Sequence, residues 1–284
     1  MKLAQKIAIG LIRAKLSVIA VISKPKAAEA AMKIFSTPFR KTKKQTPPVF
    51  RKAEKLAFKL DGNMIRGHRW NAGKETRVLI VHGFESSSKN FDRYITPLVK
   101  QGNEVFAFDA PAHGGSGGRQ INLLSYVQML REIHSRYGPF QAYLSHSFGG
   151  LAVTHFLETV QHDENVRLVL IAPTTESTSA IDSFFRILRL GIDIRKEFDE
   201  LIVAKSGESP AHFSVRRAIK NIQAKILWFH DEGDELTPFE DAMRVKEENH
   251  PHIEFVITKG LGHRKIYREN KVVRRVVDFM NGER

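Results

Sequence analysis

The sequence predicts an α/β protein with a mostly parallel central sheet of about eight strands, helices on both faces of the sheet and a helical cap insertion. The first observation is a series of short apolar runs separated mostly by helical stretches, which is typical of a parallel sheet covered on both sides. The second is a helical and basic segment that precedes this series. The third is one connection of about 50 residues, far longer than a helix crossover needs.

Charge is concentrated at the beginning of the chain. The 284 residues carry a net charge of +14, but residues 1–52 hold 13 Lys and Arg against the single acid Glu29. The remaining 32 basic and 30 acidic residues nearly cancel, and aromatic residues are sparse in the basic stretch, so a nucleic-acid partner is not expected. The absence of cysteine excludes disulfides and thiolate metal sites, and it favours a cytoplasmic location.

Residues 1–52 are predicted to form a basic helical extension and linker. Residues 3 to about 35 read as one helix that is apolar over most of its circumference and has a narrow basic edge. Lys6, Arg13 and Lys15 interrupt the apolar run, so neither a signal peptide nor a membrane span is expected. A linker with prolines and the basic residues Arg40, Lys41, Lys43 and Lys44 follows. Two interpretations stay open for residues 1–35: peripheral contact with an anionic membrane, or packing onto the chain's own domain or another subunit.

The predicted strands begin after residue 53 and continue to the C-terminus. Residues 55–60 and 64–70 flank the turn Asp61-Gly62-Asn63 and indicate a hairpin. Further apolar runs are found at 77–81, 104–108, 140–144, 166–171, 225–229 and 252–257, with helices expected at 121–137 and 149–160. Residues 53–284 are therefore expected to form the main domain.

The long connection predicts a helical cap at about 177–223. Its apolar residues either line an acyl pocket or pack the cap onto the sheet; they are Phe184, Phe185, Ile187, Leu188 and Leu190.

Residues 142–150 read Ala-Tyr-Leu-Ser-His-Ser-Phe-Gly-Gly, in which a strand stops, Ser147 turns and two glycines open a helix. This segment resembles the nucleophile elbow of the α/β-hydrolase superfamily, where small residues stand two positions before and after the serine. Ser145 replaces the usual first glycine. The resemblance extends from about Leu56 to Phe279 and implies an α/β-hydrolase fold with Ser147 as nucleophile.

The other two residues of a catalytic triad follow in the order that this family uses. In His230-Asp-Glu-Gly-Asp-Glu-Leu-Thr-Pro238, Asp234 stands four residues after the strand-ending histidine and four before the proline, where the family carries its acid. The segment Lys259-Gly-Leu-Gly-His-Arg264 resembles the family's histidine loop and implies His263 as general base. Other acids of the first loop are rivals to Asp234; they are Asp231, Glu232 and Glu235.

Two further motifs resemble those of the family. His82-Gly83-Phe84 resembles its oxyanion loop, which implies the backbone N–H groups of Phe84 and Phe148 as oxyanion donors. Residues 109–116, Asp-Ala-Pro-Ala-His-Gly-Gly-Ser, are similar to a loop in which a glycine usually stands at Ala112, and His113 is expected to organise that loop.

The resemblance implies a serine hydrolase, carboxylesterase- or lipase-like, that cleaves an ester or thioester of a small or acyl-chain substrate through an acyl-enzyme. Amide or C–C bond cleavage, or a non-catalytic binding role, are the alternatives. No cofactor or metal is expected, because the glycines at 114, 115, 117 and 118 lack the spacing of a dinucleotide loop and no phosphate-loop or zinc signature is present.

Overall fold

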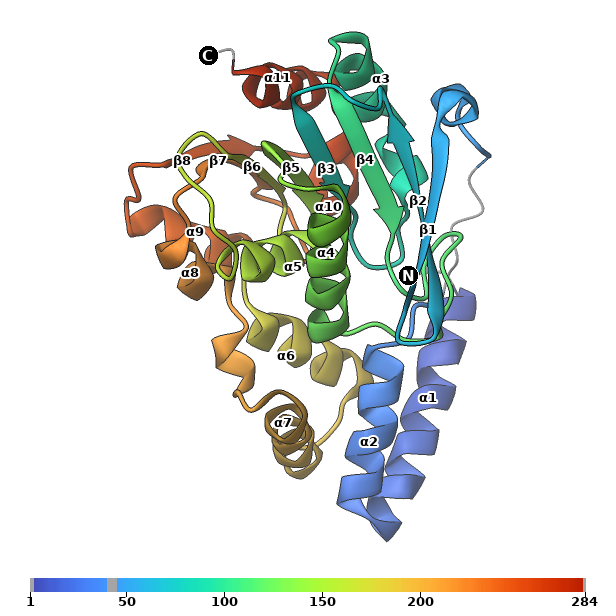
Figure 1. Cartoon of the computed structure of the whole chain (residues 1–284). Coiled ribbons are helices and arrows are strands. Elements are labelled where there is room, and N and C mark those ends of the chain that lie inside the picture. The colour runs from blue at the N-terminus through green and yellow to red at the C-terminus, as the bar shows by residue number, and fades with distance from the viewer. Residues whose placement is uncertain (1–2, 40–44, 283–284) are drawn as a thin grey trace. The chain divides into compact units, whose positions relative to one another are not determined.

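The computed structural model contains an eight-stranded sheet of order β1-β2-β4-β3-β5-β6-β7-β8 (Figure 1). Strands β3 to β8 are parallel, whereas β2 runs antiparallel to β4, and β1 antiparallel to β2. The α/β architecture predicted from the sequence is confirmed. The structure describes residues 3–39 and 45–282, so the predicted basic run at residues 40–44 lies outside the described part. The strands are β1 Glu54–Leu60, β2 Asn63–Trp70, β3 Arg77–Val81, β4 Glu104–Asp109, β5 Ala142–His146, β6 Arg167–Ile171, β7 Lys225–Asp231 and β8 Ile253–Thr258.

Helices cover both faces of the sheet. The α-helices are α1 Leu3–Ile22, α2 Lys24–Phe35, α3 Asp92–Lys100, α4 Leu123–Tyr137, α5 Phe148–Leu157, α6 Ser177–Leu188, α7 Ile192–Ser206, α8 Val215–Ala218, α9 Phe239–Glu247, α10 Gly262–Lys265 and α11 Asn270–Asn281. Short 3-10 helices lie at Pro48–Lys52, Ser88–Phe91, Pro210–His212, Ile219–Asn221 and Ile266–Arg268. Helices α4, α5, α8 and α9 pack on one face and α3 and α11 on the other. Two apolar layers therefore bury the central strands, which explains their continuous Val, Leu and Ile runs.

The order of the strands determines which loops lie next to each other at the carboxyl edge of the sheet. The chain passes from β3 outward to β4 and then returns to β5 on the other side of β3, so the loops after β3 and β5 leave the sheet side by side. Such a reversal point is where open α/β sheets usually place their ligands. The residues that follow β3, β5, β7 and β8 are those that the sequence motifs single out.

The contacts divide the chain into two compact units: Met1–Thr37 with Glu176–Ser214, and Pro38–Thr175 with Val215–Arg284. The larger unit contains the whole sheet. The smaller unit has its own apolar core, in which helices α1, α2, α6 and α7 bury residues such as Leu16, Ala28, Phe185 and Phe198. The predicted domain division, 1–52 and 53–284 with a cap at about 177–223, stays a prediction.

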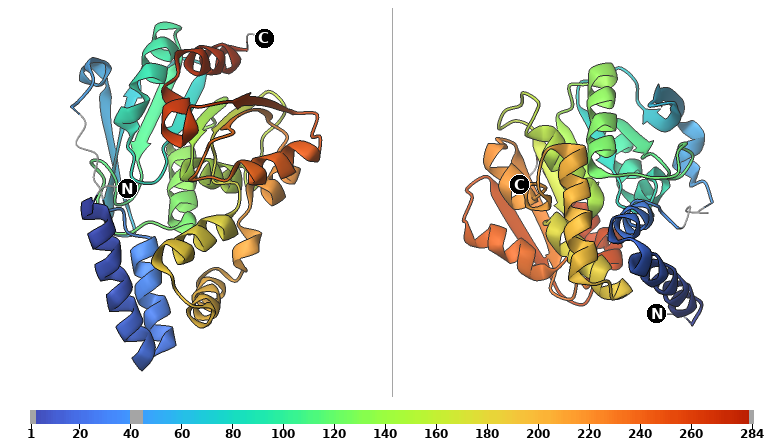
Figure 2. Two further views of the ribbon diagram at one scale, coloured as in Figure 1. Left: turned by 180° about the vertical axis from the view of Figure 1, so that it is seen from behind. Right: turned by 90° about the horizontal axis from the view of Figure 1, so that it is seen from below.

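Residues 3–35 form two helices, where the sequence predicts one (Figures 1 and 2). The break falls at Ser23, which has an extended backbone and accepts a hydrogen bond from the Lys26 N–H through its hydroxyl oxygen (3.4 Å). Pro25 causes it, because proline has no N–H for a helix interior but fits the first turn of a new helix. The two helices lie side by side in the smaller unit. Among the described helices, none is long and apolar enough to span a membrane.

The apolar residues predicted for the cap belong mainly to the core of the smaller unit. Phe185 and Leu188 are buried there, and the ring of Phe185 meets that of Phe198 edge-on at 5.2 Å. Ile187 is half exposed. Packing within the unit therefore accounts for Phe185 and Leu188.

Candidate functional site

Ser147 occupies a strained turn between β5 and α5. Its backbone has φ 56° and ψ −127°, a conformation that residues other than glycine rarely adopt. The Ser147 N–H donates to the carbonyl of Ile171 (3.1 Å), and its own carbonyl accepts from the N–H groups of Gly150 (2.8 Å) and Thr174 (3.1 Å). These three bonds hold a conformation that would otherwise cost about 1–3 kcal/mol, and they expose the side chain at the end of the sheet.

The residues around this turn are small because other backbone segments pass within contact distance. A Cβ on Gly149 would lie 2.5 Å from the carbonyl oxygen of Val81, and one on Gly150 would lie 2.6 Å from the Pro173 side chain. Ser145 replaces the usual first glycine without harm, because its buried hydroxyl donates to the carbonyl of Val169 on β6 (2.9 Å). The departure from the family pattern is thus accommodated by one hydrogen bond.

The structure brings Ser147, His263 and Asp234 together in the larger unit. His263 Nε2 lies 3.0 Å from Ser147 Oγ, and His263 Nδ1 lies 2.8 Å from Asp234 Oδ2. Because the carboxylate accepts from Nδ1–H, the neutral ring presents the lone pair of Nε2 to the serine hydroxyl. This arrangement lets the imidazole accept the serine proton while the carboxylate stabilises the resulting cation.

Asp234 is buried but remains ionised. Burial raises the pKa of its carboxyl, but the hydrogen bond and charge of His263 and the N–H groups of Thr237 and Leu236 (each 2.9 Å) outweigh burial. The pKa therefore lies below its ordinary value. The Thr237 hydroxyl donates to Asp234 Oδ2 as well (2.8 Å). All these donors fix the carboxylate in the orientation that His263 needs.

The three rival acids point elsewhere. Asp231 is fully buried and its Oδ2 accepts from the Thr258 hydroxyl (2.7 Å) and the Leu261 N–H (3.0 Å), so it shapes the loop that carries His263. Glu232 is exposed and pairs with Lys259 at 3.5 Å, and Glu235 is also exposed. The geometry distinguishes Asp234 from the other acids of its loop.

His146, the residue directly before Ser147, packs against the imidazole ring of His263. Its ring packs against those of His263 (centroids 4.7 Å) and Tyr267 (4.5 Å), and its Nε2–H donates to the His263 carbonyl (3.1 Å). Burial and the nearby charge of His263 lower the pKa of His146 to about 3. A neutral ring is thus kept beside His263 across the working pH range of most proteins.

The two expected oxyanion donors lie on adjacent segments. Phe148 is the first residue of α5, and the first N–H groups of a helix have no acceptor within it. Phe84 follows Gly83, whose added Cβ would lie 2.8 Å from the Cβ of Ser147. The close approach of this glycine brings the Phe84 backbone beside the serine. The role of these two N–H groups as oxyanion donors stays a prediction.

A buried polar network supports the loop of Phe84. The Ala110 N–H donates a hydrogen bond to His82 Nε2 (2.9 Å). The ring proton is therefore on Nδ1, and Nδ1–H donates to the Gly83 carbonyl (2.8 Å). His113 accepts the Glu85 N–H at Nε2 (3.0 Å), and its Nδ1–H donates to the Pro111 carbonyl (2.9 Å). These bonds fit the loop-organising role expected of His113. Ala112 has φ 65°, which explains why glycine is usual at its position.

Sequence reasoning missed Thr237, Asp231 and His146 as supporting residues. The signals were present, because Thr237 stands directly before Pro238, Asp231 ends a strand, and His146 precedes the serine. Their partners, however, come from loops that only the folded sheet brings together.

Comparisons with known proteins agree with this fold. Residues 72–201 match the model of a family described as serine aminopeptidase, S33. An esterase of Pyrococcus furiosus has a similar structure: it is 20% identical, with a TM-score of 0.63, over 87% of this chain and 98% of that chain. The chain therefore has the α/β-hydrolase fold.

Other similar structures are also distant in sequence. A monoacylglycerol lipase of Paleococcus ferrophilus is 22% identical, with a TM-score of 0.60, over 77% of this chain and 98% of that chain. The alpha/beta hydrolase domain-containing protein 10 from mouse is 14% identical, with a TM-score of 0.59, over 81% and 98%. A sequence search of curated proteins found no match. These similarities concern the α/β-hydrolase fold and leave the substrate open.

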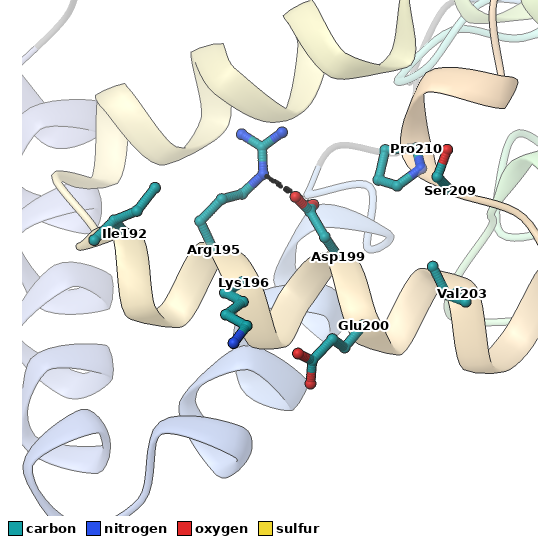
Figure 3. Close-up of a pocket in the computed structure, with 8 residues that line it drawn as sticks. All are labelled: Ile192, Arg195, Lys196, Asp199, Glu200, Val203, Ser209 and Pro210. Atoms are coloured by element: carbon teal, nitrogen blue, oxygen red, sulfur yellow. Dashed lines mark hydrogen bonds and ion pairs between the residues drawn. The ribbon is translucent and has the colours of Figure 1, made fainter.

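A hollow of about 520 Å³ lies in the smaller unit along α7, and Ser209 and Pro210 also line it (Figure 3). Two cations line it, Arg195 and Lys196, and Arg195 is already bonded to Asp199 (2.9 Å) and to Asp182. None of the three triad residues lines it. Within residues 3–39 and 45–282, no group of three His, Asp or Glu is arranged to hold a metal ion.

The protein is expected to lose stability as the pH falls from 6.5 toward 3. The unfolded chain protonates His146 near its ordinary pKa of 6.5, whereas the folded chain keeps it neutral down to about 3, so stability is complete above pH 6.5. At pH 5 this residue alone lowers the free energy of unfolding by about 2 kcal/mol. Burial also lowers the pKa of other histidines, including His82 and His230, which adds to the loss.

Urea unfolding at pH 7.5 and pH 5 measures the effect. The control is His146→Gln, whose amide N–H replaces the Nε2–H donor but does not titrate. Its loss between the two pH values should be smaller than that of the wild type by about 2 kcal/mol. An equal loss in both proteins would contradict the assignment to His146.

Proposed function

We propose that this chain is a serine hydrolase that cleaves a carboxylic ester or thioester of a small or acyl-chain substrate. The observation that carries the proposal is the unbroken line of contacts from Asp234 through His263 to Ser147, with distances of 2.8 and 3.0 Å. The α/β-hydrolase fold and the presence of esterases and lipases among similar structures support it.

In the first step His263 Nε2 removes the proton of Ser147 Oγ as the oxygen attacks the substrate carbonyl. Asp234 holds the imidazole in the tautomer that can accept this proton and stabilises the cation that forms. The leaving alcohol or thiol then takes the proton from His263, and an acyl-enzyme remains on Ser147.

The N–H groups of Phe84 and Phe148 stabilise the negative oxygen of the tetrahedral intermediate. Backbone donors are suited to this role, because the fold aims them before charge develops and no reorganisation is needed. Water then attacks the acyl-enzyme, with His263 again as base, and the acid product leaves Ser147 free.

A serine at the turn disfavours reactions that need a carboxylate nucleophile, such as dehalogenation or epoxide opening. Amide and C–C bond cleavage use the same residues and are the alternatives within the fold. A non-catalytic binding role is disfavoured by the hydrogen-bonded state of all three triad residues. Cytoplasmic location and contact with a membrane or a second copy through residues 1–35 stay predictions.

Replacement of Ser147 is expected to abolish ester hydrolysis. We expect the wild type to hydrolyse p-nitrophenyl esters, tested from acetyl to long acyl chains, and Ser147→Ala to lose nearly all turnover because the attacking oxygen is gone. The control is Ser145→Ala, since this buried hydroxyl donates to Val169 on the neighbouring strand and does not face His263. Turnover by Ser147→Ala equal to the wild type would refute the role of Ser147, and the best chain length would measure the acyl site.

Replacement of Asp234 should lower kcat, whereas replacement of Asp231, the other buried acid of the same loop, should mainly lower stability. Asp234→Asn is expected to lower kcat on the best p-nitrophenyl ester by about 10³- to 10⁴-fold, because the amide favours the wrong imidazole tautomer. Asp231→Asn should keep kcat within about tenfold but destabilise the fold by about 1–3 kcal/mol, since one hydrogen bond to the His263 loop is lost. The same two measurements, kcat and urea unfolding, are made on both variants. A larger kcat loss for Asp231→Asn would reverse the assignment.

A further inference from the structure

Helix α1 has an outer face that is apolar and that the described residues of the smaller unit leave exposed. Among its described side chains, five aliphatic ones are between 56% and 89% exposed; they are Ile7, Leu11, Val18, Val21 and Ile22. Monomeric proteins seldom expose a contiguous apolar patch of this kind, and such patches mark interaction sites.

Helical geometry joins these residues into one continuous stripe. Positions 7, 11, 14, 18 and 21 follow steps of four and three residues, so they lie on one side of the helix from residue 7 to residue 21. The residue at position 14 is alanine and is also exposed. The opposite side of α1, with Ile12, Leu16 and Ile19, packs into the core of the smaller unit. The helix is therefore apolar on two sides, and only the inner side has a partner within the unit.

Cations border the outer stripe on both sides. Lys15 lies on one border and Lys6 on the other, both exposed. Next to Lys6 is a hollow of about 450 Å³ between α1 and the end of α6, lined by Lys6, Arg13, Arg186 and Arg189 together with Ile9, Gly10 and Ile187. No acidic residue lines this hollow, so its four cations attract an anion.

Arg13 supplies a second indication of an anionic ligand. Its guanidinium donates one N–H to the carbonyl of Ile187 (3.1 Å), but its Nε is buried and has no hydrogen-bond partner among the described residues. A buried charged donor without an acceptor is costly unless a ligand satisfies it. A phosphate oxygen is the acceptor that an arginine fork binds best.

We propose that α1 docks on an anionic phospholipid bilayer. The apolar stripe lies along the boundary between headgroups and acyl chains, and the bordering cations and the basic hollow bind lipid phosphates. A helix with an apolar face and basic borders is the arrangement found in interfacial amphipathic helices. The 13 Lys and Arg against one acid in residues 1–52 add attraction to a negative surface.

A second copy of the chain fits this face less well. Pairing two α1 stripes would bring the basic borders of both copies together, and residues 1–52 offer only Glu29 to offset them. Like charges that face each other across an interface are unfavourable. The charge pattern thus selects an anionic partner over an identical one.

The test is co-sedimentation of the full chain with vesicles of equal parts phosphatidylcholine and phosphatidylglycerol, and with vesicles of phosphatidylcholine alone. We expect binding to the anionic vesicles only. The variant I7Q/L11Q/V18Q should bind at least about tenfold more weakly, because the apolar stripe is lost. The variant K6Q/R186Q should weaken binding by roughly tenfold, because two cations near the surface are lost.

The matched control is I192Q/V203Q, which removes two exposed aliphatic residues of the same unit from α7, where Asp199 and Glu200 are near. It should bind like the wild type. Glutamine suits exposed helical positions, and circular dichroism melting confirms that each variant is folded. A Val18→Trp variant gives an independent readout, because brominated lipids quench a tryptophan that enters the bilayer.

No sedimentation of the wild type overturns the proposal, and so does equal binding by I7Q/L11Q/V18Q. A dimer in sedimentation velocity that this variant abolishes, without vesicle binding, would assign the stripe to a second copy. Ester hydrolysis by Ser147 is measured separately on soluble p-nitrophenyl acetate, so a failure of the proposed chemistry and a failure of membrane docking are distinguishable.

Discussion

The site depends on one backbone conformation that is unfavourable by itself. Ser147 has φ 56°, and the fold maintains it by continuing the hydrogen-bond pattern of the sheet past the ends of β5 and β6. The same turn requires glycine at positions 83, 149 and 150, because neighbouring backbone or side chains occupy the space of a Cβ. Strain, close packing and exposure of the serine hydroxyl are therefore aspects of a single arrangement.

A buried polar framework surrounds Ser147, His263 and Asp234 and orients them. Neutral His82 and His113 fix the segment that leads to Phe84, while Thr237 and two backbone N–H groups orient Asp234. Asp231 accepts hydrogen bonds from Thr258 and Leu261 and so holds the loop that carries His263. Most of these groups are buried in pairs of donor and acceptor, so the site is prepared before a substrate arrives.

Local sequence was sufficient to predict most strands and helices and to single out Ser147, Asp234 and His263, which the structure brings together. The turn at Ser147, the loop of Asp234 and the glycines before His263 are short segments with strict spacing, and the apolar runs that set the strands are local as well. The supporting roles of His146, Thr237 and Asp231 were missed, because their partners lie on segments that are distant in sequence.

Two differences outside the site have equally physical causes. Pro25 was visible in the sequence, but the apolar period continued across it and masked the helix break at Ser23. The packing of residues 1–37 with residues 176–214 into one core could not be predicted, because no local pattern in either segment indicates contact with the other.

The shared core also sets an order of events during synthesis. Helices α1 and α2 emerge first, but α6 and α7, which complete their core, are made only after the intervening 38–175 segment. Because synthesis adds about 5–20 residues per second, the inner apolar faces of α1 and α2 are made on the order of ten seconds before α6 and α7. Until α6 and α7 are made, the apolar residues on both sides of α1 therefore lack the core that buries the inner side in the folded unit.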